Sequence, residues 1–107
     1  MSKYRNKKTV VDGITFDSKK EAARYLVLKS LQRSGVLTEL ILQPEFLLCP
    51  SVMLDGKQQR PVRYRADFSY KIDGMVMVED CKGFRTPEYR IKRKLMRHVH
   101  GVEVIES

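Results

Sequence analysis

The sequence predicts one small domain of the α/β (α+β) class, with a small mixed central sheet flanked by helices. The length of 107 residues suits a single domain. Two segments combine helix boundary signals with helical spacing, and the segments around them have strand composition. After an N-terminal hairpin the order is helix, three strands, helix and strand, as in a sheet flanked by helices.

The charge balance indicates an anionic partner. Lysine and arginine total 21 against 13 acidic residues, which gives a formal net charge of +8. Nucleic acid is the first class of partner that this surplus favours, and an acidic membrane surface is the second. No apolar run is long enough to span a bilayer, and no apolar segment follows the basic N-terminus as in a secretory signal. We therefore expect a cytoplasmic protein with reduced cysteines.

The beginning of the chain predicts a loose arm and a short hairpin. Residues 1–9 are polar and basic, with four cations among them. Asp12-Gly13 is a strong turn dipeptide between two short apolar runs. These features predict a basic N-terminal arm that leads into a hairpin.

A helix follows the hairpin. Asp17 or Ser18 is expected to cap it, because Glu21 stands three residues after Ser18 in capping-box order. Gly35 is expected to end it. Apolar residues recur at helical spacing and predict its buried face: Ala22, Tyr25, Leu26, Leu28 and Leu31.

The middle of the chain predicts strands. Residues 36–49 form a strand or a bent pair of strands, with Pro44 marking a bulge or an edge. Residues 50–61 have the composition of a turn. The segments Val62–Lys71 and Met75–Lys82 are strands joined by an Asp-Gly turn, so they form a hairpin.

The last part predicts a helix and a short strand. Thr86 suits the N-cap and Pro87 the first helical position, and the helix is expected to run to about His100. Gly101 ends it, and Val102–Ile105 form the final strand. The helix is strongly basic, and acids interleaved for salt bridges are missing after its first turn. A stripe at spacing i, i+4, i+8 is expected to face the core: Ile91, Leu95 and Val99.

Charged side chains stand at the end of the most apolar strand. Alternation puts Asp80 and Lys82 on the face of Val78, and Glu79 on the other face. Asp67 lies about as far from the hairpin turn as Asp80 does, so the two can be cross-strand neighbours. Two carboxylates this close repel each other unless a positive charge lies between them.

A divalent cation is the simplest way to satisfy this pair. Carboxylate oxygens with retained water suit Mg²⁺ or Mn²⁺. Lys82 could then stabilise charge on an attacked phosphate or assist the attacking water. Together, Asp67, Asp80 and Lys82 indicate hydrolysis of a phosphodiester. The simpler interpretation is a polar Asp67 on an exposed face and a surface ion pair of Asp80 with Lys82.

This pattern resembles the PD-(D/E)XK nuclease superfamily. Asp67 with Asp80-Cys81-Lys82, in this order of elements, carries the resemblance, and FDSKKEAARY, QPEF and KRKL extend it over nearly the full chain. Small phage and prophage endonucleases of the Holliday-junction-resolvase type are similar in these motifs. The resemblance implies a restriction-endonuclease-like core of αβββαβ order and a bacterial host cell. One departure is Ala66, which stands where the nominal motif has proline.

The resemblance also implies site residues. Glu21 corresponds to a first-helix glutamate that reaches the metal, although a capping box alone would also explain it. Gln43 resembles a strand glutamine of several members, and either a supporting role or strand hydrogen bonding fits it. Glu79 is expected to point outward or to support the site, since parity favours Asp80 as the ligand.

The sequence therefore predicts a Mg²⁺- or Mn²⁺-dependent DNA endonuclease, with branched DNA as the implied substrate and a homodimer as the expected assembly. A nuclease of other specificity and a non-catalytic DNA-binding module on the same fold are the alternatives. The cations expected to bind phosphates lie in the arm and in the last helix: Lys3, Arg5, Lys7, Lys8, Arg90, Lys92, Arg93, Lys94 and Arg97.

Overall fold

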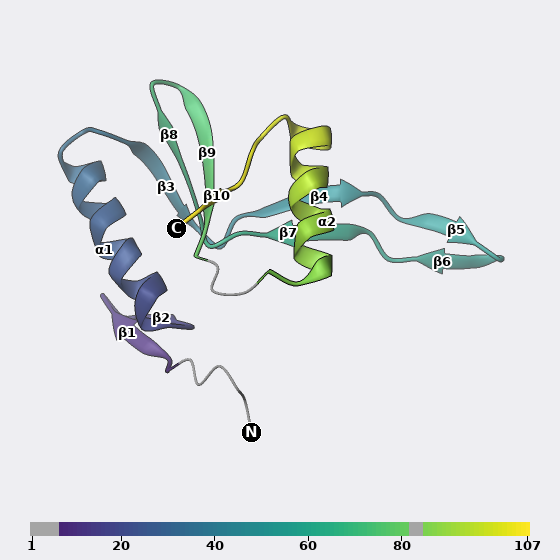
Figure 1. Cartoon of the computed structure of the whole chain (residues 1–107), viewed down its shortest axis with the longest axis horizontal. Helices are drawn as coiled ribbons and strands as arrows, with labels where there is room; N and C mark the ends of the chain where they lie inside the picture. Colours follow the sequence, from purple (N-terminus) through teal and green to yellow (C-terminus); the bar gives the residue numbers. More distant parts are fainter. Residues whose placement is uncertain (1–6, 82–84) are drawn as a thin grey trace.

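The computed structural model describes residues 7–81 and 85–107 and is a mixed α+β structure, as the sequence predicts (Figure 1). Over these residues it contains two α-helices and four small sheets. The elements are β1 (Thr9–Val11), β2 (Ile14–Phe16), α1 (Lys19–Arg33), β3 (Thr38–Leu42), β4 (Glu45–Cys49), β5 (Val52–Leu54), β6 (Lys57–Gln59), β7 (Val62–Arg65), β8 (Phe68–Ile72), β9 (Met75–Asp80), α2 (Pro87–Leu95) and β10 (Ile105–Glu106).

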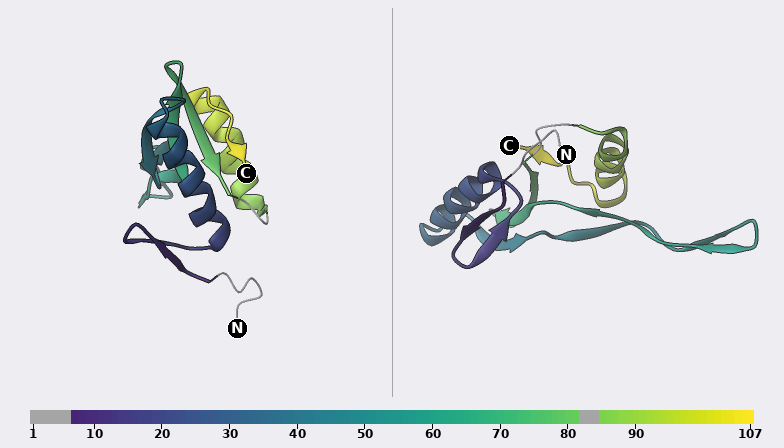
Figure 2. Two further views of the ribbon diagram at one scale, coloured as in Figure 1. Left: turned by 90° about the vertical axis from the view of Figure 1, so that its left-hand side faces the viewer. Right: turned by 90° about the horizontal axis from the view of Figure 1, so that it is seen from below.

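The central sheet has four strands in the order β10-β9-β8-β3. Strands β3, β8 and β9 are antiparallel, and the two-residue β10 runs parallel to β9. The last strand is shorter and later than expected, because only Ile105 and Glu106 pair with β9. Helices α1 and α2 lie on opposite sides of β8 and β9 (Figures 1 and 2).

Both long predicted strands bend at the same place. The segment 36–49 divides into β3 and β4 at Gln43-Pro44, and the segment 62–71 divides into β7 and β8 at Ala66-Asp67. Two backbone hydrogen bonds cross the bend, from Gln43 N–H to Asp67 O (2.9 Å) and from Ala66 N–H to Pro44 O (3.1 Å). The bend places Asp67, just before the start of β8, at the junction of two sheets.

Helix α1 begins and ends as its sequence predicts. The Ser18 hydroxyl accepts a hydrogen bond from the Glu21 N–H at 3.1 Å, and Gly35 adopts a positive φ just after the helix. Leu26 is half exposed rather than buried, because it lies at the flank of the stripe that faces the sheet. The core on this side consists of Phe16, Ala22, Tyr25, Leu28, Leu37, Phe68 and Tyr70.

Helix α2 starts at the Thr86 N-cap but buries a different face from the predicted one. Tyr89 and Met96 are buried, whereas Ile91 is 60% exposed and Val99 47% exposed. Of the predicted stripe only Leu95 packs against the core, because the large buried Tyr89 ring sets the orientation of the helix. A π-helical turn over Met96–His100 then ends the helix at Gly101. The core on this side consists of Leu48, Tyr64, Ala66, Val78, Tyr89, Met96 and Val104.

Residues 50–61, which we call the β-arm, form a hairpin rather than a turn region. Val52–Leu54 and Lys57–Gln59 pair in antiparallel fashion, and Asp55 and Gly56 turn the chain with positive φ. The β-arm continues the ribbon of β4 and β7 outward past α2, and Figure 2 shows this projection from below. Neither helix in the described ranges is long and apolar enough to cross a membrane.

Candidate active site

Asp67 and Asp80 come together at the end of β9, as the hairpin register predicts. The last ladder pair is Phe68 with Glu79, and one further step sets Asp67 opposite Asp80. The Asp67 N–H donates to Glu79 O at 3.2 Å, which extends the ladder to this position. The Asp67 Oδ2 accepts a hydrogen bond from the Cys81 N–H at 2.7 Å, and this bond fixes the carboxyl group beside the strand end.

The pair is held in an environment that disfavours two negative charges. Asp80 is only 2% exposed, and Asp67 is half-buried. Burial, followed by a hydrogen bond with Asp80 and the charge of Asp80, raises the pKa of Asp67 to about 8, although the Cys81 N–H acts in the opposite direction. Asp67 therefore favours its protonated form at neutral pH beside the Asp80 carboxyl group.

Glu21 faces this pair from the first turn of α1. Its side chain is buried, and burial followed by the charges of Asp17 and Asp80 raises its pKa. Its electrostatic coupling to Asp80 supports the sequence prediction that the first helix brings a carboxylate toward the site. Its N–H donates to the Ser18 hydroxyl, so the capping interpretation of Glu21 is confirmed, and its role at a metal site stays a prediction.

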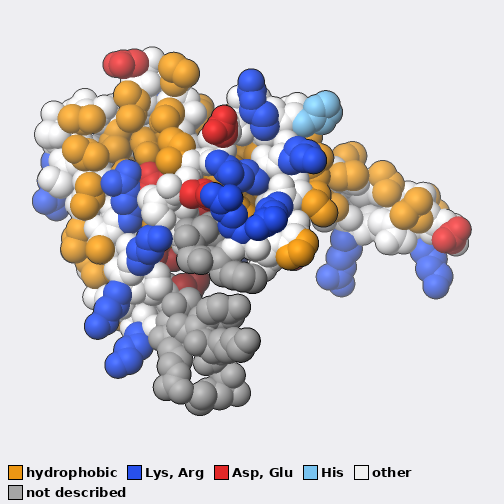
Figure 3. All heavy atoms as spheres, in the orientation of Figure 1, with side chains coloured by type: hydrophobic (Ala, Val, Ile, Leu, Met, Phe, Trp, Pro, Cys, Tyr) orange, Lys and Arg blue, Asp and Glu red, His pale blue; other side chains and the backbone are white. Residues whose placement is uncertain are grey.

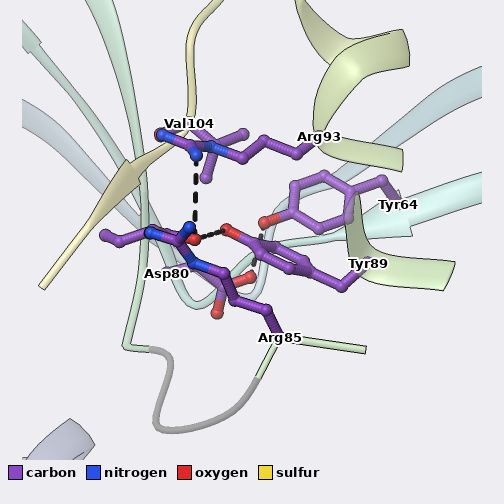
Figure 4. Close-up of polar contacts among 7 residues, drawn as sticks. Tyr64, Asp80, Arg85, Tyr89, Arg93 and Val104 are labelled. Carbon is purple, nitrogen blue, oxygen red and sulfur yellow. Dashed lines mark hydrogen bonds and ion pairs between the residues drawn. The ribbon is translucent and has the colours of Figure 1, made fainter. Parts of the chain in front are cut away.

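Tyr64 holds Asp80 in place, and it is not among the site residues that the sequence predicts. Its hydroxyl, which comes from β7, donates a short hydrogen bond to Asp80 Oδ2 (Figure 4). Burial and the hydrogen bond to Asp80 raise the pKa of Tyr64 far above its usual value, so it stays a donor. The centres of the Tyr89 and Tyr64 rings lie 6.3 Å apart. The Tyr89 hydroxyl donates a hydrogen bond to Glu106 Oε2 at 2.8 Å.

Glu79 is neither exposed nor at the Asp67–Asp80 pair. It is fully buried on the α1 side of the sheet, where Arg24 donates two hydrogen bonds to it and Tyr70 donates a third at 2.8 Å. Burial alone would raise the pKa of Glu79, but the bonds from Arg24 and Tyr70 outweigh burial and lower it. The prediction of an outward Glu79 is therefore wrong, since Arg24 compensates its charge inside the fold.

The remaining candidate, Gln43, lies at the bend next to the site. Its side chain is exposed, and its backbone N–H donates to Asp67 O. It adopts a φ of 51°, in the left-handed region that non-glycine residues seldom occupy. The structure thus supports a role for Gln43 in shaping the bend that carries Asp67.

The donor set suits a hard divalent cation in part. Among the described residues, no group of three or more His, Cys, Asp or Glu side chains is placed to hold a metal ion together. The predicted three-carboxylate set of Asp67, Asp80 and Glu21 is therefore reduced to a close pair with Glu21 facing it. Magnesium is commonly held by one or two carboxylates with waters and substrate phosphates, so a pair with these oxygen donors fits it.

Three predicted site residues lie outside the described residues. They are Lys82, Lys3 and Arg5. Lys7 and Lys8 are described and exposed, and Lys8 lies 3.9 Å from the Asp17 carboxylate.

The basic face of α2 is partly used by the fold itself. Arg93 donates two hydrogen bonds to Val104 O, and Lys92 forms an ion pair with Glu88 at 3.3 Å. Acids are missing after the first turn, as the sequence indicates, and Glu88 in that turn pairs with Lys92 one turn later. Arg93 therefore anchors the chain before β10 rather than standing free (Figure 4).

Two hollows at the surface around α2 are lined by cations. One of about 550 Å³ is lined by Arg85, Arg90, Arg93, Lys94 and Arg97, and Figure 3 shows Lys and Arg side chains gathered over α2. The other, of about 420 Å³, lies between α2 and the β4–β7 ribbon next to Tyr64. Its cations are Arg63, Arg65 and Lys92, of which the sequence had suggested only Lys92.

Comparison with curated proteins and with solved structures finds no match to this chain. A family model described as a protein of unknown function, DUF1064, matches residues 1–104. That match spans nearly the whole sequence, and the chain belongs to the DUF1064 family.

Proposed function

We propose that this protein is a metal-dependent DNA endonuclease of the PD-(D/E)XK type. The observation that carries the proposal is the pair formed by Asp67 and Asp80 at the end of β9, two residues before Lys82. A fold that serves only stability gains nothing from two neighbouring buried carboxylates, because their charges repel each other. Such pairs concentrate at functional sites, because a cation or a reacting group relieves their repulsion.

The arrangement of elements supports the same proposal. Helix α1, strands β3, β8 and β9, helix α2 and strand β10 follow one another in αβββαβ order, with the β-arm inserted between β3 and β8. The four strands form one mixed sheet with a helix on each side. On this basis we assign a restriction-endonuclease-like core, as part of the proposal.

Each residue then has a defined task. Asp67 and Asp80 would hold Mg²⁺ or Mn²⁺, and Glu21 would accept a hydrogen bond from one of the waters around the ion. The bound cation would polarise the phosphate and acidify the attacking water. The hydroxyl of Tyr64 fixes the orientation of the Asp80 carboxylate and shields one side of it from water. Lys82 would stabilise the charge that develops on the phosphate.

The cations around the site would bind the DNA backbone. Arg90, Lys94 and Arg97 line one hollow, and Arg63 and Arg65 line the other, so phosphates could approach the carboxylates from both sides of α2. These contacts position DNA without reading its sequence. We propose branched DNA as the substrate and a homodimer as the active form, because paired cuts in two strands need two sites.

The test is cleavage by the purified chain of four-way junction, fork, linear duplex and single-stranded DNA in Mg²⁺ or Mn²⁺. Preferential, paired cutting of the junction is expected, and chelation should abolish it. Asp80→Asn should remove cleavage and leave DNA binding in place, whereas Asp73→Asn, at an exposed turn, should cut normally. Equal cutting of all substrates would contradict junction specificity, and binding without any cleavage would favour the non-catalytic module.

A further inference from the structure

The β-arm exposes apolar side chains that the fold leaves uncovered. Val52, Met53 and Leu54 are 40%, 59% and 58% exposed, and Figure 3 shows hydrophobic side chains along the projecting ribbon. A two-stranded ribbon is marginal in water unless something packs against it. Three consecutive large apolar residues at such a position indicate a surface that meets a partner.

The opposite strand of the β-arm is polar and cationic. Lys57 stands across from Leu54, and Gln58 stands across from Met53. Arg60 follows, and within the β-arm the single acid is Asp55 at the turn. Interfaces between proteins are depleted of lysine at their centre. A DNA groove offers phosphates to cations, base edges to amides and thymine methyl groups to apolar side chains, so it matches this combination.

Cations recur along the chain that returns from the β-arm toward Tyr64. Arg65 and Arg63 line the hollow beside Tyr64, and Arg60 and Lys57 follow along the same returning chain. From Arg65 to Lys57 an extended chain covers roughly 26 Å at about 3.3 Å per residue. This length corresponds to about 8 base pairs of duplex at about 3.4 Å each.

We propose that the β-arm lies in the major groove of duplex DNA on one side of the cleavage site and reaches about 8 base pairs from it. A two-stranded ribbon fits the width of that groove. The cations of the β-arm, Lys57 and Arg60, complement DNA and would repel the β-arm of a second copy. The proposal rests on the proposed function in one respect, because it takes DNA as the substrate.

The experiment measures DNA binding with cleavage switched off by Asp80→Asn. On this background, Lys57→Gln/Arg60→Gln is compared with Arg33→Gln/Lys71→Gln, which removes the same charge from positions on the body. Fluorescence anisotropy over a salt series gives the slope of log affinity against log salt. Hydroxyl-radical footprinting gives the protected region, relative to the cut mapped with the wild-type chain.

Lys57→Gln/Arg60→Gln should lower the salt slope by about 2, since two phosphate contacts are lost. Arg33→Gln/Lys71→Gln should change the slope little. Protection about 8 base pairs from the cut should disappear on one side. Met53→Ser/Leu54→Ser should remove the same protection with an unchanged salt slope. Because these side chains are exposed, thermal unfolding should match that of the parent.

Several outcomes would overturn the inference. An unchanged slope and footprint in both β-arm variants would do so. Sedimentation equilibrium could also show that the chain is a dimer and that Met53→Ser/Leu54→Ser dissociates it. If the DNA affinity per protomer were preserved, the partner of the β-arm would be a second copy, and the inference would fail. A wild-type chain that binds DNA through the β-arm but cleaves nothing counts against the nuclease proposal alone. Cleavage with no effect of the β-arm variants counts against the β-arm alone.

Discussion

Replacing Asp67 by asparagine should make the protein more stable at alkaline pH. The pKa of Asp67 is raised to about 8 in the folded state from its ordinary value of 3.8, so the folded state holds a proton that the unfolded chain has lost. A carboxyl group with a raised folded pKa stabilises the fold at low pH, and this contribution disappears as pH rises toward the folded pKa. A tenfold difference in proton affinity between the two states corresponds to at most about 1.4 kcal/mol.

The expected size follows from the position of the side chain. Asp67 is half-buried, so solvent screens part of the electrostatic cost, and we expect Asp67→Asn to raise the free energy of unfolding by roughly 2 kcal/mol at pH 8.5. Near pH 4 the difference should become small, because the unfolded carboxyl group then also begins to hold a proton. Mg²⁺ should stabilise the wild-type chain at pH 8.5 and have little effect on the variant.

Urea unfolding followed by far-UV circular dichroism, between pH 4 and 8.5, measures these quantities. Asp73→Asn is the matched control, since Asp73 is exposed and its positive φ of 50° suits asparagine equally well. Parallel stability curves for the wild type and Asp67→Asn across this range would refute the raised pKa of Asp67. Equal stabilisation of the wild type and of Asp67→Asn by Mg²⁺ would refute the location of the cation at Asp67.

Two further changes test the supporting contacts. Tyr64→Phe removes the hydroxyl that donates to Asp80. It should lower kcat about 10-fold with DNA affinity unchanged, as is common for groups that orient a ligand. Equal cleavage rates would show that Asp80 needs no such support. Arg24→Met leaves Glu79 buried without its cation and should destabilise the fold by about 3 kcal/mol at pH 7, with less loss near pH 4 where Glu79 can take up a proton. Chemical denaturation checks the second change, and a loss that does not depend on pH would contradict this explanation.

Local signals in the sequence predicted much of the framework. The cap at Ser18, the turn at Asp12-Gly13 and the start of α2 at Thr86 depend on neighbouring residues alone, so they could be read directly. Strand alternation correctly separated Asp80 from Glu79, and the turn distance correctly set Asp67 opposite Asp80.

The parts that failed depend on contacts between distant segments. Arg24 and Glu79 are 55 residues apart, and nothing near either one indicates the other. The hydrogen bond from Tyr64 to Asp80 requires the bend at Ala66-Asp67, which turns β7 toward α2. Residues 50–61 lack the alternation of a half-buried strand, because no layer covers the β-arm, and their composition therefore suggested a turn.

Diffraction from crystals soaked in Mn²⁺ tests the central claim most directly. An anomalous peak should lie between the carboxylates of Asp67 and Asp80, at about 2.0–2.2 Å from their oxygens, and should be lost in Asp67→Asn. Peaks at exposed acids such as Asp55 alone, or a peak that survives this substitution, would contradict the claim that the two carboxylates form a cation site.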